Sequence, residues 1–442
     1  LSSMSERGKE PKIKSSKYSL HINSGGYKIN NVSDLYSNEN YLINFDGRIE
    51  NRNKLIAEIG ISKDISDAEL TLNLYTKERH NCLQRIIGCF SFIIYEIKTK
   101  KIFIGKDHLG IVPLYYVLNK KFFMYGTEPK FIFCSNLVAK EINKNRAKNF
   151  ILKSEKYYEE CFFSNMHKPL GSHYTNIEGS EINQKRYFKF SAKINNNSFS
   201  KDDWAHDFRT HLAGSTDQMV AGNKDIAISL SGGLDSNTIL SLARSKLVKN
   251  KIDRIGCYYA RFVDLKEEDH ENSNEDYFVD KVPSSEKIKI NHVDIEDTDV
   301  IKEINANQKD KPEPDYDATR HIQTRVNEAC KNDGFNVVFT GFDGDTIVSH
   351  GYETIFYDVL RGNFQTAFEE YRKDRTRKKL ETKLVDFIWR FVIGSYTPYF
   401  VKHLYKLAKR DLLQHHAAFF ASEEIRRTIK FKDNKRIYST DG

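Results

Sequence analysis

The sequence has few of the features that would set it apart from ordinary globular proteins. Its six Cys residues form no Cys-x-x-Cys pair and have no dense spacing, which argues against a disulfide scaffold or a zinc ribbon and fits a reducing cytoplasm. The longest apolar run, residues 86–95, is about half of what a bilayer span needs. No amino-terminal stretch has the pattern of a signal peptide. We therefore expect a cytoplasmic protein that does not enter a membrane.

The composition is sufficient for a buried core. The 442 residues are 39% hydrophobic and 29% charged, and they include 29 Phe and 24 Tyr. This excludes a wholly disordered chain and allows two or three domains. The net charge of +8 is mild for this length, so we expect no nucleic-acid partner.

The first part of the chain predicts a β-rich unit with a few helices. Apolar runs bounded by turn residues predict strands at 42–45, 90–97, 101–105, 120–126 and 186–190. Between them, residues 65–75 have helix-start chemistry, with Ser66 as N-cap and Glu69 three residues later. The polar, Asn- and Ser-rich segment 194–203 predicts a domain boundary.

The second part changes its hydrophobic period. Short buried-type strands are expected at 226–230, 254–260, 287–293 and 336–340. Helical stretches lie between them, including 317–331, and residues 355–442 are expected to be mostly helical, with Trp389, Phe391 and Leu412 in the core. Alternation of strand and helix predicts a parallel sheet, and ligands bind at the carboxyl ends of such strands.

The strongest local signal is IAISLSGGLDSNTIL, residues 226–240. A buried strand leads through Gly232 and Gly233 directly into a helix. Because glycine has no Cβ, the backbone can turn sharply there and approach a phosphate. The N–H groups of the loop and of the first helical turn would then point at the anion.

Side chains of the same segment suit a nucleotide with its metal. Ser231 and Ser236 can add hydroxyl donors, whereas Asp235 would repel phosphate and is better explained as a ligand of Mg²⁺. The Lys of the kinase-type phosphate loop is absent. The alternative is a glycine-rich turn in which Asp235 is only a first-turn carboxylate.

The string SGGLDS resembles the pyrophosphate loop of AMP-forming ATP-dependent ligases, in particular the asparagine synthetase superfamily. The resemblance implies that ATP is cleaved between its α and β phosphates, that a carboxylate is adenylated, and that an amine then attacks it. The residues that it implies for ATP binding are Leu230, Ser231, Gly232, Gly233, Leu234, Asp235, Ser236, Gly341 and Phe342.

A second string, VVFTGFDGDTIVSHG at 337–351, resembles the second active-site loop of the family. It implies that Asp345 binds Mg²⁺ together with Asp235, and we name these two acids as catalytic and metal-binding residues. The alternative is that Asp343 and Asp345 form an Asx-turn. The family has Glu where this chain has Phe342, and an apolar ring cannot act as a general base.

Residues 42–131 resemble the glutaminase-type domain of the same family. The matching strings are NFDGRIENRNKL, SDAE, GCFSFIIYE, KDHLGIVPLYY and GTEPK. The implied fold class is α/β: a glutaminase-like αββα domain of the Ntn-hydrolase type at 1–193, and a parallel-sheet ATP-pyrophosphatase domain with a helical carboxyl-terminal part at 204–442.

The glutaminase pocket departs from the family pattern. Asp46 occupies the position of the oxyanion-hole Asn, where a carboxylate would repel an oxyanion, and Arg48 occupies the position of the glutamine-binding Glu. No Cys precedes Cys82, although LSSMSERG resembles an internal helix of the family, which would place the family's first residues before Leu1. We expect an inactive glutaminase domain.

With these departures, the chain resembles the branch of the family that includes lasso-peptide cyclases and β-lactam synthetases. The resemblance implies a peptide or small-molecule carboxylate substrate, macrolactam closure in antibiotic biosynthesis, a leader peptidase as partner, and ATP and Mg²⁺ as cofactors. Two alternatives are asparagine synthesis from ammonia and a non-catalytic nucleotide-binding partner protein. The second is suggested because the chain has no match to the family segment that carries a catalytic Lys.

Two shorter resemblances are weaker. Glu313-Pro314 resembles a segment that lines the nucleotide cleft in the family, although a lone dipeptide of this kind is more often a turn. Asn274-Glu275 resembles an acidic pair of the family, with Asn in place of the first acid.

Overall fold

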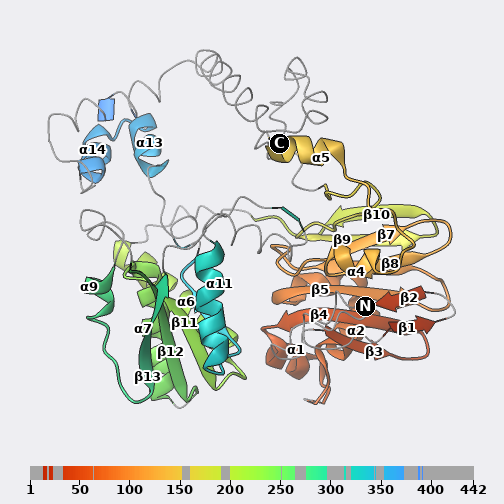
Figure 1. Ribbon diagram of the computed structural model, residues 1–442, viewed down its shortest axis with the longest axis horizontal. Helices are drawn as coiled ribbons and strands as arrows, with labels where there is room; N and C mark the ends of the chain where they lie inside the picture. The colour runs from red at the N-terminus through yellow and green to blue at the C-terminus, as the bar shows by residue number, and fades with distance from the viewer. Residues whose placement is uncertain are drawn as a thin grey trace.

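A computed structural model describes the chain over residues 13–16, 19–22, 33–62, 64–151, 160–190, 200–249, 251–263, 275–295, 313–314, 320–342, 344, 353–372, 387–388 and 391. Within these ranges, the first half contains an antiparallel sheet and the second half a parallel one (Figure 1). This confirms the expected fold class.

The first half is built on a six-stranded sheet in the order β10-β9-β6-β5-β4-β3, and all of its neighbours are antiparallel. Its strands are β3 (Ser33–Ser37), β4 (Tyr41–Ile49), β5 (Gly88–Glu96), β6 (Ile102–Lys106), β9 (His173–Glu178) and β10 (Glu181–Arg186). Two further pairs are the hairpins β1 (Ile13–Ser16) with β2 (Ser19–Ile22) and β7 (Tyr115–Leu118) with β8 (Phe123–Gly126). The strands predicted from residues 42–45, 90–97 and 101–105 are confirmed as β4, β5 and β6.

The helices of this half are α1 (Arg52–Ile59), α2 (Asp67–Glu78), the short 3₁₀ helix η2 (Arg79–Asn81), α3 (Cys82–Arg85), α4 (Pro129–Phe133) and α5 (Lys144–Ile151). The predicted start of α2 is confirmed. Ser66 is its N-cap, and the Ser66 hydroxyl accepts a hydrogen bond from the backbone N–H of Glu69 at 3.2 Å.

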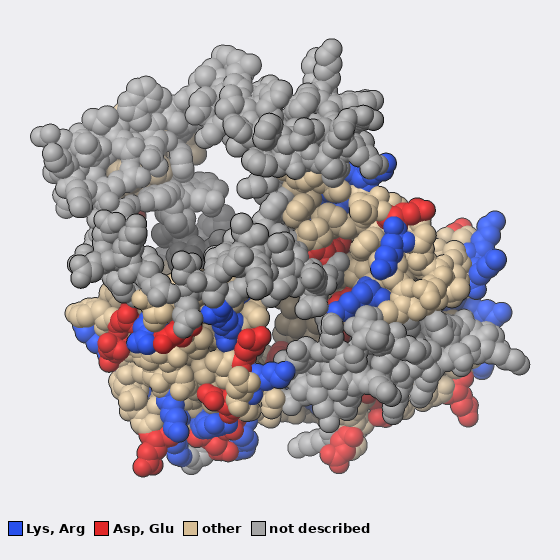
Figure 2. Space-filling model, viewed as in Figure 1, with Lys and Arg blue, Asp and Glu red and all other residues tan. Residues whose placement is uncertain are grey.

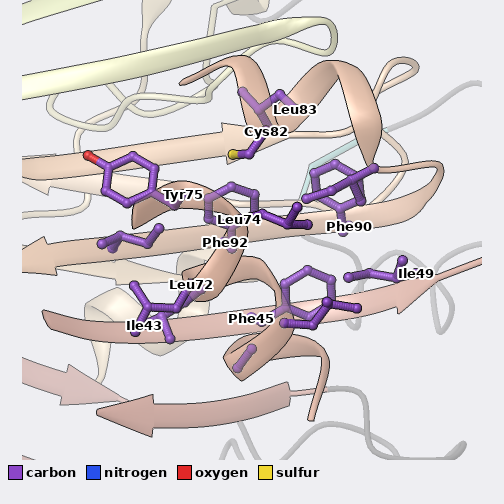
Figure 3. Close-up of a cluster of buried hydrophobic side chains, with 14 of the residues drawn as sticks. Ile43, Phe45, Ile49, Leu72, Leu74, Tyr75, Cys82, Leu83, Phe90 and Phe92 are labelled. Carbon is purple, nitrogen blue, oxygen red and sulfur yellow. The ribbon is translucent and has the colours of Figure 1, made fainter. Parts of the chain in front are cut away.

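Both faces of the central strands β4, β5 and β6 are largely buried, whereas the edge strand β10 is exposed. On one face, Phe45 of β4 and Phe92 of β5 stack with ring centroids 6.2 Å apart and pack with Leu74 of α2 (Figure 3). On the other face, Ile93 and Ile104 pack against the β7–β8 hairpin. Since neighbouring residues of a strand point to opposite faces, Asn44 and Asp46 of β4 belong to this second face.

The second half contains a four-stranded parallel sheet in the order β13-β12-β11-β14. The strands are β11 (Asp225–Leu230), β12 (Arg254–Phe262), β13 (Ile288–Ile295) and β14 (Val338–Thr340), as the sequence predicts within a few residues at each end. The chain moves outward from β11 in one direction through β12 and β13, and then in the other direction to β14. The strand order therefore reverses between β11 and β14, which is where ligands bind in open parallel sheets.

Helices cover both faces of the parallel sheet. The helices that pack on it are α6 (Lys201–Val220), α7 (Leu234–Val248), α9 (Asp276–Val279) and α11 (Arg320–Asn332). Two later helices, α13 (Glu353–Leu360) and α14 (Phe364–Arg372), pack against each other in a separate cluster. Leu240 and Ala243 of α7 pack on Ile226 and Ile228 of β11, whereas α11 covers Ala227 on the opposite face. Among the three core positions expected beyond residue 355, Phe391 is buried, and Trp389 and Leu412 lie outside the described residues.

One strand expectation is wrong. Residues 186–190 were expected to form the last strand of the first half, but the strand, β10, ends at Arg186. The turn at Gly179 pairs Glu181 with Glu178. In this register Arg186 pairs with His173, which is the first residue of β9, so β10 has no further partner on that strand. The chain then leaves the sheet, and the Tyr187 hydroxyl donates to the carbonyl of Lys106 at 2.7 Å.

The predicted boundary segment 194–203 contains a helix start. Ser200 caps α6, and its side chain and that of Asp203 exchange hydrogen bonds with each other's backbone N–H groups. Residues 191–199 lie outside the described part of the chain.

No helix within the described residues is both long enough and apolar enough to span a bilayer. On the face of the molecule in Figure 2, Lys and Arg side chains are interspersed with Asp and Glu side chains.

Candidate active site

The loop between β11 and α7 is held by its own side chains. The backbone N–H of Ser231 donates to the Ser236 hydroxyl oxygen at 3.0 Å, and this oxygen lies 2.9 Å from the carbonyl oxygen of Ser231. Ser236 is almost fully buried. Its hydroxyl therefore closes the loop onto the first turn of α7, and the contribution that we expect from it at a nucleotide site is structural.

Asn237, in the first turn of α7, is a residue that holds the loop and that sequence reasoning missed. Its side-chain amide donates to the carbonyl oxygens of Ser231 at 3.2 Å and Gly233 at 2.9 Å. An amide one turn into a helix can bond back to the preceding loop, and its position directly after SGGLDS was the available signal.

The predicted nucleotide-binding residues of this segment fall into two groups. Leu230 is 4% exposed and belongs to the core, so only its backbone faces the carboxyl edge of the sheet. Leu234 is 86% exposed at the first position of α7, and Asp235 follows it in the same turn. The N–H groups of this turn have no partner within the helix, as at any helix start.

The second loop lies directly beside the first. Ser229 of β11 pairs with Thr340 of β14, so Gly341 and Phe342 emerge next to Ser231. A Cβ on Gly341 would lie 2.6 Å from the backbone nitrogen of Ser236. The two loops are therefore in van der Waals contact at the point where the strand order reverses.

Gly344 brings the second loop onto the Asp235 side chain. A Cβ on Gly344 would lie 2.2 Å from both Cγ and Oδ2 of Asp235, which is shorter than any allowed contact. The Asp235 carboxylate thus lies against the residue that precedes Asp345 in the sequence. Asp343 and Asp345 themselves are outside the described residues.

Phe342 and Glu275 complete the described part of this edge. Phe342 is 85% exposed, so its ring lies on the surface beside the loops. The Glu275 carboxylate accepts a hydrogen bond from the backbone N–H of Gly232 at 2.6 Å. Across the described ranges, no three His, Cys, Asp or Glu side chains come together in a way that could hold a metal ion.

The glutaminase-like pocket of the first half is polar and largely buried. Asp46, Ser91 and Lys106 are paired in register across β4, β5 and β6, so their side chains share one face of the sheet. A small pocket there is lined by Asp46 and Ser91 together with Thr127. Burial lowers the pKa of Lys106 to about 8, although Asp107 acts in the opposite direction.

The Arg48 side chain reaches the second half of the chain. Its Nη2 donates to the carbonyl oxygens of Gln218 at 3.1 Å and Ala221 at 2.6 Å, at the carboxyl end of α6. A guanidinium is well placed there, because the last carbonyls of a helix lack partners and carry the negative end of the helix dipole. Burial raises the pKa of the neighbouring Glu50, although Arg48 opposes that shift.

Glu313 makes a second link between the two halves. Its carboxylate binds Lys168 Nζ at 3.1 Å and accepts from the backbone N–H of Phe162 at 3.3 Å. The sequence resemblance suggested that Glu313 lines a nucleotide cleft. In the structure its carboxylate is engaged with the first half of the chain.

We expect the substitution Lys168→Met to lower the free energy of unfolding by about 1–3 kcal/mol, because it leaves the Glu313 carboxylate, whose side chain is only 11% exposed, without its cation. Lys101→Met is the matched control: Lys101 and its partner Glu178 are 47% and 56% exposed, and such pairs contribute roughly 0–1 kcal/mol. Urea unfolding of both variants measures the difference. Equal midpoints for the two variants would show that the Glu313 link contributes nothing.

Comparison with known proteins gives two family matches that together cover most of the chain. Residues 34–188 match the model of a glutamine amidotransferase domain, and residues 207–427 match that of asparagine synthase. The second match alone spans half of the chain.

Three curated relatives are named as asparagine synthetases. Glutamine-hydrolyzing asparagine synthetase 3 of Bacillus subtilis is 23% identical over 219 residues, which are 48% of this chain and 35% of the relative. Asparagine synthetase 2 of the same organism is 26% identical over 46% of this chain and 29% of the relative. A putative asparagine synthetase 2 of Methanocaldococcus jannaschii is 24% identical over 50% of this chain and 44% of the relative. The matched segments thus span less than half the length of each of these relatives.

Proposed function

Because the chain belongs to the asparagine synthase family, we propose that it is an ATP-dependent amide-forming ligase that activates a carboxylate with release of pyrophosphate. The observation that carries this proposal is the meeting of two loops at the switch point of the parallel sheet, where Gly344 lies against the Asp235 carboxylate. A site of this kind combines a backbone anion cradle with an acid suited to a divalent cation.

The described residues fit ATP and Mg²⁺. The N–H groups that follow the Ser231–Gly233 turn, those of Leu234 and of the first turn of α7, would bind the phosphates, since they lie at a helix start. Asp235 would hold Mg²⁺, and we propose Asp345 as its second ligand. When bound, the ion would supply charge stabilisation to the leaving pyrophosphate.

The chain's own contribution to the reaction is positioning. The side chains of Ser236 and Asn237, in the first turn of α7, preset the loop backbone before the nucleotide arrives, which lowers the cost of ordering it. Holding the carboxylate and the α-phosphate in line then accounts for much of the rate, because an oriented pair reacts as an intramolecular one.

For the acceptor, we propose an amine within the same substrate, so that the product is a macrolactam of a peptide. We propose that a leader peptidase frees this amine before the ring closes. Two observations support an acceptor other than glutamine-derived ammonia. Arg48 is engaged with the carboxyl end of α6, and Asp46 would repel an oxyanion, so we propose that the first half is an inactive glutaminase. Phe342 places an apolar ring beside the loops, where it can contact an organic substrate.

A second candidate is the amidation of aspartate by ammonia, favoured by the names of the curated relatives. The absence of an acid at Phe342 opposes it, because an aromatic ring can neither accept a proton nor bind ammonium as an ion pair.

Exchange of radiolabelled pyrophosphate into ATP tests the proposal. We expect exchange in the presence of Mg²⁺ and peptides that carry a free amino terminus and an Asp or Glu side chain, and none with aspartate. Exchange with aspartate, together with asparagine formation from ammonium, would establish the second candidate instead. Nucleotide binding without exchange, for every carboxylate offered, would indicate a non-catalytic nucleotide-binding protein.

A further inference from the structure

Glu275 makes an unusual contact with the loop that we propose to bind pyrophosphate. Its Oε2 accepts from the backbone N–H of Gly232 at 2.6 Å, which is at the short end of the range for a charge-assisted bond. The two residues are 43 positions apart in the sequence. One N–H of the glycine turn is therefore committed to a protein carboxylate rather than directed at a ligand.

Glu275 is itself firmly held from the core of the sheet. Its backbone N–H donates to the Tyr259 hydroxyl at 2.8 Å, and Tyr259 is a buried residue of β12, the strand beside β11. The carbonyl oxygen of Glu275 accepts from the N–H groups of Phe278 and Val279, and Val279 is fully buried. The carboxylate can therefore serve as a fixed reference for the loop.

Steric contacts lock the loop against the same segment. A Cβ on Gly232 would lie 2.8 Å from the Cβ atoms of both Glu275 and Phe278, so only glycine fits there. Glu275 and Phe278 pack against the first loop at Gly232. Gly341 of the second loop packs against Asp235 and Ser236, which follow the first loop. The backbone at Gly232 is therefore closely packed against the segment that carries Glu275.

A carboxylate at this place has an electrostatic cost that needs an explanation. It adds a negative charge beside a site proposed for a polyphosphate, and like charges at short range lower affinity. Two consecutive glycines, however, give the loop little intrinsic conformational preference. A strong bond from a rigid neighbour is then an effective way to set the loop before the ligand binds.

We propose that Glu275 is a positioning residue that presets the phosphate-binding conformation of the Ser231–Gly233 turn through the Gly232 N–H. This inference rests on the proposed function for the identity of the ligand, but its structural part does not. The role requires the acceptor oxygen of residue 275 and its anchored backbone, and it does not require the charge.

Two substitutions separate the bond from the charge. Glu275→Gln keeps an acceptor oxygen of the same reach, whereas Glu275→Ala removes it. We expect Glu275→Ala to weaken Mg·ATP binding about tenfold, measured by titration calorimetry, with Glu275→Gln within about threefold of the unaltered protein; tenfold corresponds to about 1.4 kcal/mol. Asp280→Ala is the matched control, because Asp280 is an exposed acid on the same segment whose backbone N–H donates to the carbonyl of Asp276.

A readout without nucleotide separates this inference from the proposed function. Hydrogen exchange of peptides covering residues 231–236 should accelerate in Glu275→Ala and stay unchanged in Glu275→Gln and Asp280→Ala. Equal loss of ATP affinity in the Gln and Ala variants would overturn the positioning role in favour of a role for the charge. Unchanged exchange in Glu275→Ala would also overturn it. If neither the unaltered protein nor any variant binds ATP, the proposed function fails. Hydrogen exchange alone then decides whether Glu275 has the positioning role.

Discussion

Replacing Asp235 by Asn is expected to reduce pyrophosphate–ATP exchange at least a hundredfold while leaving the protein folded. The reason is that the amide has nearly the shape of the carboxylate but no charge to hold Mg²⁺, and a metal at a phosphoryl centre supplies several kcal/mol of charge stabilisation. Asp235 lies in the first turn of α7 against Gly344, so no other described side chain occupies its place.

The cost in stability should be much smaller than the cost in activity. An acid in the first helical turn contributes about 0.3–1 kcal/mol through the helix dipole, and this is the most that the substitution removes. Asp225→Asn is a suitable control, because Asp225 lies at the opposite end of β11 and pairs with Arg254 at 3.1 Å, away from the loops. Exchange by Asp235→Asn at a level close to that of the control would remove Asp235 from the metal site.

Replacing Gly344 by Ala is expected to abolish exchange as completely as the loss of Asp235. The added methyl carbon would lie 2.2 Å from two atoms of the Asp235 carboxylate. Because these atoms are the end of a short side chain, they can rotate away, and the clash is relieved by misplacing the carboxylate rather than by moving the backbone. We therefore expect lost activity with little change in the free energy of unfolding.

Gly214→Ala is the matched control for this substitution. Gly214 lies within α6, and a Cβ there would meet no atom within 4 Å, so the change should stabilise the helix by about 0.5–1 kcal/mol and leave exchange intact. Measuring exchange and urea unfolding on both variants separates an effect of the added methyl group at residue 344 from a general effect of glycine replacement. Full activity of Gly344→Ala would contradict the close approach of the second loop to Asp235.

Much of the fold was predictable because it depends on short-range patterns. The apolar runs at 226–230 and 254–260 became β11 and β12, and the Ser66 capping signal marked the start of α2. The strand expected at 186–190 failed for a non-local reason. An alternating pattern fits a strand anywhere, but the hairpin turn at Gly179 set the register with β9 and ended β10 at Arg186.

The candidate site divides in the same way. The segment 231–236 could be identified from its sequence. Its glycines allow a tight turn after a strand, and its hydroxyl and carboxylate side chains suit a phosphate with its metal. That the second loop lies near Asp235 was implied only by the family resemblance, through Asp345. The contact of Gly344 with Asp235 and the bond from Gly232 to Glu275 were not anticipated. The dipeptide Glu313-Pro314 resembled a cleft segment but is more often a turn, and neither interpretation indicated the bond between Lys168 and the Glu313 carboxylate.

The sequence by itself determined the period of each element, the glycine turn after β11 and the acid that follows it, because these depend on the conformations that neighbouring residues allow. Only the tertiary structure decided which distant groups meet: Glu275 at the Gly232 N–H, Arg48 at the carboxyl end of α6, and Glu313 at Lys168. Such contacts arise from the summed packing of whole elements. No short stretch of sequence contains that sum, so the partners had to be found in space.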